Sequence, residues 1–426
     1  MKTRLLLVDD DALVLKLYRD GPTQRGFEVD TANDGLVALR SLKANKPDLL
    51  VLDLMMPRFN GVDVLRSIRS ESGLATLPVI VLSNSYMDHL AQEAANIGVQ
   101  KALLKVSCRP SLLASVIQEV LAGKPTTEDR SHLLAIPQTP ASARPPATKG
   151  ALPLTPPAAP AAPIGAARSP SAPAPLPMQA PAAPAEAPNA KTRRVLLQQA
   201  AASCGALRTH LQALAQAQND AERATRLQGL YRQVHFVTVA AGMTEAHWLA
   251  QMATVFEAML YEAMDNLTRL TPSALRTMAG TVDFLEVLFQ YSRNAEPAPA
   301  LSAQVLIVDN DPLSNRLVVS ALGRAKLRGR STADSIEALQ WLLETRYDLV
   351  LLDVEMPGLD AVQLCEQLRT LPGYDQMPVI FLAGQHDFAS RAEMAGERQD
   401  VISKPVFPME LAVKAVTQLL KNRMRQ

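Results

Sequence analysis

The chain has 426 residues, enough for about three domains at ~150 residues each. Its 43 Lys and Arg residues against 42 Asp and Glu residues leave a net charge of +1, which gives no reason to expect a nucleic-acid or anionic-membrane partner. The 3 cysteines are far apart and no run of about eighteen apolar residues occurs, so we expect no disulfide framework and no membrane span, and predict a soluble, cytoplasmic protein.

An internal repeat organises the chain. Residues 4–121 recur at 303–420, with an offset of 300 over most of the length, so that Leu-Leu-Val-Asp-Asp-Asp at 6–11 matches Leu-Ile-Val-Asp-Asn-Asp at 306–311. One residue is missing near the end of the second copy, where Lys105 matches Lys404. We predict two copies of one domain, over residues 1–124 and 297–426.

Short apolar runs alternate with segments of helical periodicity along the first copy. This alternation predicts a parallel sheet covered by helices on both faces, a fold of the α/β class. The predicted strands are residues 5–8, 27–31, 49–52, 79–82 and 102–104, and the predicted helices are 12–19, 36–43, 62–69, 89–97 and 112–121.

Polar side chains follow the predicted strands. Asp9 and Asp10 come after the first strand, Asp53 after the third, Ser83 after the fourth and Lys105 after the fifth. We expect them to meet, because ligands of open parallel sheets sit beyond the carboxyl ends of the strands. Clustered carboxylates repel one another unless a cation intervenes, and oxygen ligands favour Mg²⁺. Asp53 could then attack a phosphoryl group, with Lys105 and Ser83 on its oxygens.

These residues resemble the motifs of the response-regulator receiver domain of two-component signalling, a flavodoxin-like (βα)5 fold. The resemblance covers 118 residues in each copy. It implies that Asp53 is the phosphoacceptor, that Asp10 binds Mg²⁺ directly and Asp9 through water, and that the Met55 carbonyl is a further ligand. The alternative is that these acidic residues serve only as helix caps and strand-end ion pairs.

The second copy keeps only part of this set. Asp309, Asp353 and Lys404 are retained, so the resemblance implies a second acceptor at Asp353 and metal ligands at Asp309 and Asp353.

Three positions of the second copy differ. Asn310 replaces an acidic metal ligand, which should weaken Mg²⁺ binding, and Ala383 stands where the first copy has Ser83. Glu355 could return a carboxylate towards the metal and offset Asn310. Phosphorylation of Asp353 and a pseudo-receiver used only for docking therefore both remain open.

A Pro/Ala-rich linker is predicted over residues 125–190. The stretch from Pro137 to Pro188 holds 16 of the 31 prolines and almost no large apolar residue. Such a composition cannot bury a core and favours extended conformers. We predict a disordered tether; a proline-rich ligand for a partner domain is the alternative.

The segment 191–296 reads as four helices joined by short turns, an all-α bundle. On the second helix, the spacing of Leu227, Leu230 and Val234 predicts a buried stripe, and His235 lies at the edge of that stripe. The predicted helices are residues 195–217, 221–241, 245–266 and 273–292.

Residues 230–260 resemble a degenerate histidine phosphotransfer (HPt) domain, which implies that His235 is a phosphohistidine. An imidazole nitrogen is nucleophilic at neutral pH and suits that role. The family's lysine three residues on is here Thr238, however, and its glycine four residues on is the branched Val239, which would hinder a receiver's approach. We therefore favour the interpretation that His235 is a half-exposed helix residue without chemistry.

Together these features predict a phosphorelay response regulator. A sensor histidine kinase phosphorylates Asp53, and Asp353 as a further candidate, and the signal passes through contacts with a downstream signalling protein. We find no ATP-binding loop and no DNA-reading motif, so we expect no nucleic-acid or membrane partner and no enzyme activity beyond autodephosphorylation. A relay from one receiver through His235 to the other is a further hypothesis.

Two other functions are compatible with parts of the sequence. A signalling scaffold or pseudo-receiver adaptor would use the same domains without phosphorylation. A haloacid-dehalogenase-like phosphatase would need a second aspartate two residues after the nucleophile, where Met55 and Glu355 stand.

Overall fold

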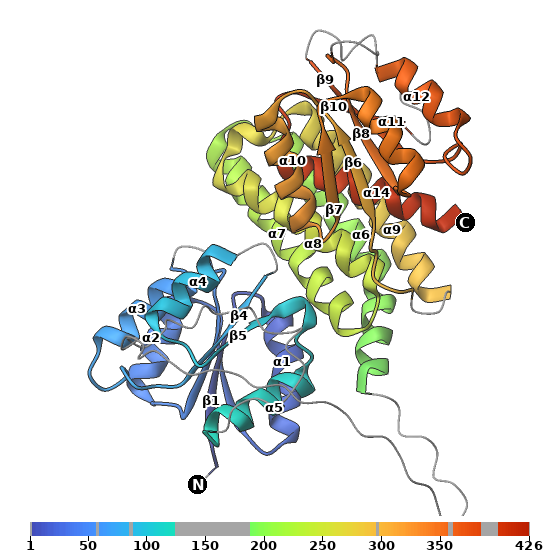
Figure 1. Ribbon diagram of the computed structural model, residues 1–426. Coiled ribbons are helices and arrows are strands. Elements are labelled where there is room, and N and C mark those ends of the chain that lie inside the picture. The colour runs from blue at the N-terminus through green and yellow to red at the C-terminus, as the bar shows by residue number, and fades with distance from the viewer. Residues whose placement is uncertain are drawn as a thin grey trace, which may run out of the picture.

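The computed structural model describes residues 2–56, 59–84, 88–123, 188–294, 298–356, 361–384 and 399–425. Three parts follow one another along the chain: an α/β unit (the N-terminal unit), a group of helices (the helical module) and a second α/β unit (the C-terminal unit) (Figure 1). The predicted linker lies outside the described residues, except for 188–190, which already belong to the first helix of the module.

The N-terminal unit contains a 5-stranded parallel sheet in the order β2-β1-β3-β4-β5. The predicted alternation of strands and helices is confirmed. Its strands are β1 (Arg4–Val8), β2 (Glu28–Ala32), β3 (Leu49–Asp53), β4 (Val79–Ser83) and β5 (Lys101–Leu104). Its helices are α1 (Ala12–Gln24), α2 (Gly35–Ala44), α3 (Gly61–Ser70), α4 (Asp88–Ile97) and α5 (Pro110–Leu121), with the 3₁₀ turn η1 (Lys105–Ser107) before α5.

Local sequence explains where these elements begin. The strands β3 and β4 are buried along their whole length, as expected for apolar runs covered on both faces. The Asp11 carboxylate caps α1 by accepting from the Leu13 and Val14 amides, and Asn60 caps α3 in a capping box with Asp63. These caps start the helices immediately after the turns at the carboxyl edge of the sheet.

The C-terminal unit repeats this topology, with strand order β10-β9-β8-β6-β7. Its strands are β6 (Gln304–Val308), β7 (Arg328–Thr332), β8 (Leu349–Asp353), β9 (Val379–Ala383) and β10 (Gln399–Ser403). Its described helices include α10 (Pro312–Arg324), α11 (Ser335–Glu344), α12 (Ala361–Thr370) and α14 (Pro408–Arg425). The two copies predicted from the repeat thus share one fold.

The region between the units is helical, as predicted. It consists of α6 (Pro188–Ala215), α7 (Asp220–Met243), α8 (His247–Asp265), the 3₁₀ turn η3 (Leu267–Arg269) and α9 (Pro272–Asn294). Helix α7 packs against α6 and α8, and α9 also packs against α6 and α8. No described helix is both long and apolar enough to cross a membrane.

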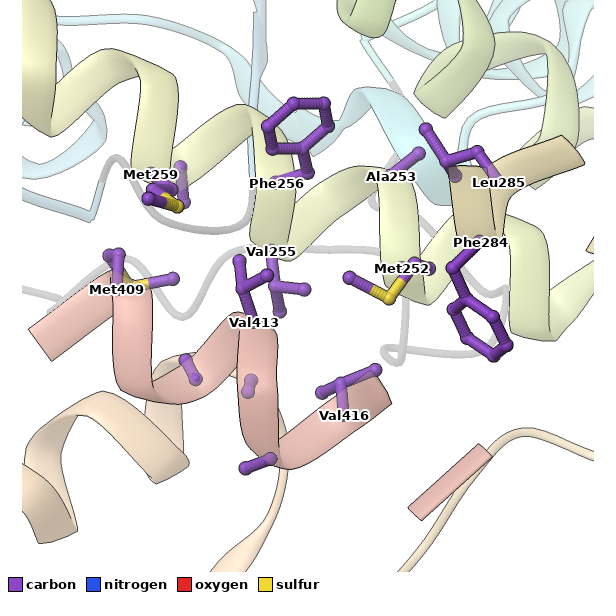
Figure 2. Packing of buried hydrophobic residues seen from close by; sticks show 14 of the residues in the cluster. Met252, Ala253, Val255, Phe256, Met259, Phe284, Leu285, Met409, Val413 and Val416 are labelled. Atoms are coloured by element: carbon purple, nitrogen blue, oxygen red, sulfur yellow. The ribbon is translucent and has the colours of Figure 1, made fainter. Parts of the chain in front are cut away.

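The helical module shares one hydrophobic core with the C-terminal unit. Helix α14 lies along α8 and α9. In Figure 2, Val413 and Met409 of α14 face Val255 and Met259 of α8. This apolar contact fixes the C-terminal unit on the module and leaves α7 free to meet the N-terminal unit.

Candidate functional site

Four predicted site residues of the N-terminal unit lie at the carboxyl edge of its sheet. Asp9 follows β1, Asp53 ends β3, Ser83 ends β4 and Lys105 follows β5. Because β1, β3, β4 and β5 are consecutive neighbours in the sheet, these residues meet in one place, and the predicted convergence is confirmed. All four side chains are buried.

One ammonium bridges two carboxylates in this pocket. Lys105 Nζ lies 2.7 Å from Asp9 Oδ2 and 2.9 Å from Asp53 Oδ2. The second oxygen of Asp53 accepts a 3.1 Å hydrogen bond from the Met55 amide, which fixes the carboxylate. Ser83 Oγ is held 3.3 Å from the Asn84 carbonyl oxygen.

The donor set fits a divalent cation. Oxygen atoms of Asp9, Asp10 and Asp53 all lie within 4.8 Å of one another. Three carboxylates beside one lysine leave an excess of negative charge in a buried pocket, which is the environment that a hard cation with oxygen ligands neutralises. These three residues would hold Mg²⁺.

The electrostatics of the pocket reflect that excess. Burial raises the pKa of Asp53 to about 7; the Lys105 charge opposes this rise and the Asp9 charge adds to it. Burial and the charge of Asp9 also raise the pKa of Asp10. Burial acts to lower the pKa of Lys105, but the charges of Asp53 and Asp9 outweigh it and raise that pKa, so the ammonium keeps its proton.

The helical module closes the pocket with His235. The Nε2 atom of His235, on α7, lies 3.0 Å from Lys105 Nζ. His235 is only 3% exposed, so the expectation that this residue is half-exposed was wrong. The reason is that the N-terminal unit covers this part of α7, which the pattern of the helix alone does not reveal.

His235 is oriented by a buried carboxylate on the next helix. Its Nδ1 atom lies 2.7 Å from Glu257 Oε1 of α8. Because Lys105 keeps its proton and donates to Nε2, the imidazole carries its own proton on Nδ1, directed at Glu257. Burial and the Lys105 charge act to lower the pKa of His235, but Glu257 outweighs them and raises it, which makes the ring more basic.

Glu257 is the centre of a network that joins the two parts. It is fully buried and accepts from Asn84 Nδ2 at 2.8 Å and from the Tyr231 hydroxyl at 3.0 Å. Asn84 belongs to the N-terminal unit, directly after Ser83, whereas Tyr231 lies one helical turn before His235 and stacks on its ring. Glu257 was not predicted from the sequence, although an acidic residue within the apolar run 255–260 is a signal for a buried, partnered charge.

Further contacts surround this centre. Arg232 Nε lies 3.3 Å from Asp10 Oδ2, and Arg109 Nη2 lies 2.5 Å from Glu245 Oε1. The backbone of η1 lies directly on α7, so close that a Cβ at Gly242 would overlap the Val106 carbonyl oxygen. Glycine is required here by close approach of two backbones.

Thr238 and Val239, which stand in place of the lysine and glycine of the HPt pattern, do not prevent the N-terminal unit from contacting α7. Val239 is fully buried and belongs to the same hydrophobic cluster as Leu103 and Leu113 of the N-terminal unit, so the expectation that it hinders a receiver was wrong. Thr238 donates to the Val234 carbonyl oxygen within the helix. The ammonium nearest to His235 is instead that of Lys105, from the opposing unit.

The matching site of the C-terminal unit differs. Lys404 Nζ lies 2.8 Å from Asp353 Oδ1 and 3.8 Å from Asp309 Oδ1. Asn310 is exposed, and the carboxylate of Glu355 lies against Gly384. Within the described part of the chain, the cluster of three carboxylates occurs only in the N-terminal unit.

Comparison with known proteins gives a consistent picture. The model of the response regulator receiver domain matches residues 5–117 and 305–416, together just over half of the chain. Response regulator MprA of Mycobacterium bovis (strain BCG / Pasteur 1173P2) is 35% identical over 138 residues, which cover 32% of this chain and 57% of that protein. MprA of Mycobacterium ulcerans is 42% identical over 83 residues, covering 20% of this chain and 35% of that protein. The chain thus spans about half the length of the curated relatives or less.

Solved structures of single domains also align with this chain. The chemotaxis response regulator CheY4 of Vibrio cholerae is 26% identical and covers 28% of this chain and 99% of its own, with a TM-score of 0.27. A putative response regulator from Chloroflexus aurantiacus is 28% identical and also covers 28% of this chain and 99% of its own, with a TM-score of 0.26.

Proposed function

The chain belongs to the response regulator receiver family, and on this premise we propose that it is a phosphorelay response regulator whose phosphoacceptor is Asp53. The observation that carries the proposal is the buried group of Asp53, Asp9 and Asp10 bridged by Lys105. A sensor histidine kinase is the proposed donor, and a downstream signalling protein the proposed recipient of the signal, both in the cytoplasm.

The residues of the pocket have separate tasks in phosphoryl transfer to Asp53. A carboxylate oxygen of Asp53 attacks phosphorus as the bond between phosphorus and the donor's leaving group breaks, while Lys105 stays protonated and faces the oxygens of the transferring group. Ser83, at the end of β4, is placed to donate to one of these oxygens. Mg²⁺, held by Asp9, Asp10 and Asp53 with the Met55 carbonyl as a further ligand, would supply positive charge on the other oxygens.

We further propose that the helical module is a four-helix bundle of the HPt kind and that His235 exchanges phosphoryl groups with Asp53 of the same chain. The contact of one ammonium with both Asp53 Oδ2 and His235 Nε2 supports this, because the reacting atoms are then separated by no more than the sum of two short contacts. Glu257 holds the proton on Nδ1 and leaves the Nε2 lone pair facing the acceptor pocket.

The transfer balances without an added reactant. The Nε2 lone pair of His235 forms a P–N bond as the bond between phosphorus and the Asp53 oxygen breaks, and the electron pair of that bond returns to the carboxylate. The Nδ1 proton stays in place, so the phosphorylated ring carries a positive charge that faces Glu257. The reverse step moves the phosphoryl group back to Asp53.

The second step of an internal relay, transfer from His235 to Asp353, has no comparable support. The carboxyl ends of β8 and β9, where Asp353 lies, point away from α7 and α8 (Figure 1). Lys404 is 22% exposed and forms ion pairs with Asp353 and Asp309 of its own unit. We propose that Asp353, if it accepts a phosphoryl group, takes it from another molecule rather than from His235 of its own chain.

The experiment that tests the main proposal uses the full chain with Mg²⁺ and acetyl phosphate, followed by intact-mass measurement. We expect a mass gain of about 80 Da in the wild type and its loss in Asp53→Asn. Asp353→Asn is the matched control, because it changes the same residue type in the other copy. An adduct that persists undiminished in Asp53→Asn and is lost in Asp353→Asn would refute the assignment, and absence of any adduct would favour the non-phosphorylated scaffold.

A further inference from the structure

The helical module covers the acceptor pocket of the N-terminal unit. The side chains of Asp9, Asp53 and Lys105 are each only 1% exposed. The corresponding lysine of the C-terminal unit, Lys404, is 22% exposed. Asp309 and Asp353 of the C-terminal unit are as buried as Asp9 and Asp53, so the difference lies in the lysine, which His235 of the module covers in the N-terminal unit.

The surface around the pocket is also less exposed in the N-terminal unit than in the C-terminal unit. Leu17 of α1 is half-buried against the helical module, whereas its counterpart Leu317 of α10 is 51% exposed. Asp10 is half-buried beside Arg232, whereas its counterpart Asn310 is exposed. The face that the C-terminal unit exposes to solvent therefore corresponds to the face of the N-terminal unit that contacts α7 and α8.

His235 occupies the position that the histidine of an external phosphodonor would need in order to reach Asp53. A donor histidine must bring its ring nitrogen to the Asp53 oxygen from outside the sheet edge, and in this structure that approach is filled by the ring of His235 and by the Asn84–Glu257 contact. Two imidazole rings cannot occupy one place. His235 is equally out of reach of any acceptor other than Asp53, because it is 3% exposed.

We propose that the helical module is an intramolecular cover, and that the N-terminal unit must separate from α7 and α8 each time a phosphoryl group enters at Asp53 or leaves from His235. The closed form permits exchange only between these two residues. The inference rests on the proposed function of Asp53 and adds how access to it is controlled.

The interface is suited to such reversible opening. Its centre consists of hydrogen bonds and ion pairs, made by Asn84, Glu257, Arg232, Asp10 and the pair Arg109–Glu245, beside an apolar contact that includes Val239 and Met243 of α7. Polar groups of this kind are satisfied by water on separation, so a polar interface costs less to open than an apolar one. The contact between α14 and α8 is apolar at its centre, and the polar contacts of Glu410 on α14 with Ser273 and Thr277 lie on α9.

Gly242 offers a way to open the interface without touching the reactive groups. In Gly242→Val the new side chain would overlap the Val106 backbone of the opposing unit, so the two parts cannot stay in contact there. The matched control is Gly280→Val on α9, because a Cβ at Gly280 meets nothing within 4 Å. Arg232→Glu, which places a negative charge beside Asp10, opens the same interface by a second route.

The test measures the initial rate of phosphoryl incorporation from acetyl phosphate and Mg²⁺ into the full chain. All variants carry His235→Ala and Asp353→Asn in addition, so that the label reports Asp53 alone. We expect Gly242→Val and Arg232→Glu to be labelled at least about tenfold faster than the parent, in line with a shift of the population from closed to open. Gly280→Val should be labelled like the parent, and small-angle scattering should show a larger radius of gyration only for the two opening variants.

The outcomes separate the inference from the function on which it rests. Equal labelling of the parent and both opening variants would overturn the cover, although Asp53 would remain the acceptor. Absence of label in every variant, open or closed, would refute the proposed function of Asp53 and the cover with it.

Discussion

Replacing Glu257 by glutamine removes the negative charge that faces Nδ1 of His235 and keeps the size of the side chain. The amide oxygen can still accept from His235, Tyr231 and Asn84, as the carboxylate does now. What is lost is the charge that raises the pKa of His235 and that offsets the positive ring formed when His235 is phosphorylated. The change therefore separates orientation of the ring from its electrostatic stabilisation.

The size of the effect follows from the type of hydrogen bond. Bonds to a charged partner contribute about 1.5–3 kcal/mol, whereas neutral ones contribute about 0.5–1.5 kcal/mol. The difference of ~1–2 kcal/mol applies to the transition state, where the ring charge develops, and corresponds to transfer from Asp53 to His235 that is about 5- to 30-fold slower. Because Glu257 is fully buried, this charge is not replaced by water.

The assay begins with Asp53 phosphorylated by a small donor and follows phosphohistidine by rapid quench or by ³¹P NMR. Glu262→Gln is the control, because Glu262 lies on the same helix and pairs with Arg324 and Arg269 instead of His235. The control should transfer at the wild-type rate. A Glu257→Gln variant that folds and transfers at the wild-type rate would refute the electrostatic role of Glu257, and phosphohistidine that never forms in the wild type would refute the exchange itself.

Three further results are expected. Mg²⁺ binding, measured by calorimetry, should weaken about tenfold per pH unit below pH ~7, because the pKa of Asp53 is raised to about 7 and protons compete with the metal; binding that is constant from pH 5 to 8 would contradict this. Asn310→Asp should tighten Mg²⁺ binding at the C-terminal unit and raise labelling of Asp353, scored in an Asp53→Asn background, and no gain would support a docking-only role for this unit. Met409→Ala should lower the free energy of unfolding by about 2–4 kcal/mol in urea titrations, because Met409 is 1% exposed in the core shared with the helical module, and a change below about 1 kcal/mol would contradict that packing.

The fold of both α/β units could be predicted because the central strands are short apolar runs, the helices show their own periodicity, and the second unit repeats the sequence pattern of the first. The pocket could be predicted for a related reason. In a parallel sheet, the residues after Val8, Leu52, Leu82 and Leu104 must meet at one edge, so sequence position alone brings Asp9, Asp53, Ser83 and Lys105 together. No long-range packing has to be known for this step.

The burial of His235 could not be predicted, because it depends on how two separately folded parts meet. The stripe Leu227, Leu230 and Val234 identifies the face of α7 that packs within the module, and His235 lies beside it. Nothing in that pattern says that a second domain covers the neighbouring face. The buried Glu257 was the available signal, since an acidic residue among apolar neighbours on α8 requires a polar partner, and His235 on the adjacent helix was a candidate.

The two copies of one domain meet the helical module in different ways, and a single helix explains the difference. Ten residues of α14 are buried on all sides, whereas α5, its counterpart, buries only Leu113, Ala114, Val116 and Ile117. The buried positions of α14 cover more than one face of the helix, which packs on α10 and its own sheet and also on α8, and this anchors the C-terminal unit on the module. With fewer positions of α5 buried, the N-terminal unit meets α7 through the edge that carries Asp53, where polar contacts lie beside Val239 and Met243. The C-terminal unit is thus anchored on the helical module, whereas the N-terminal unit carries the proposed phosphoacceptor.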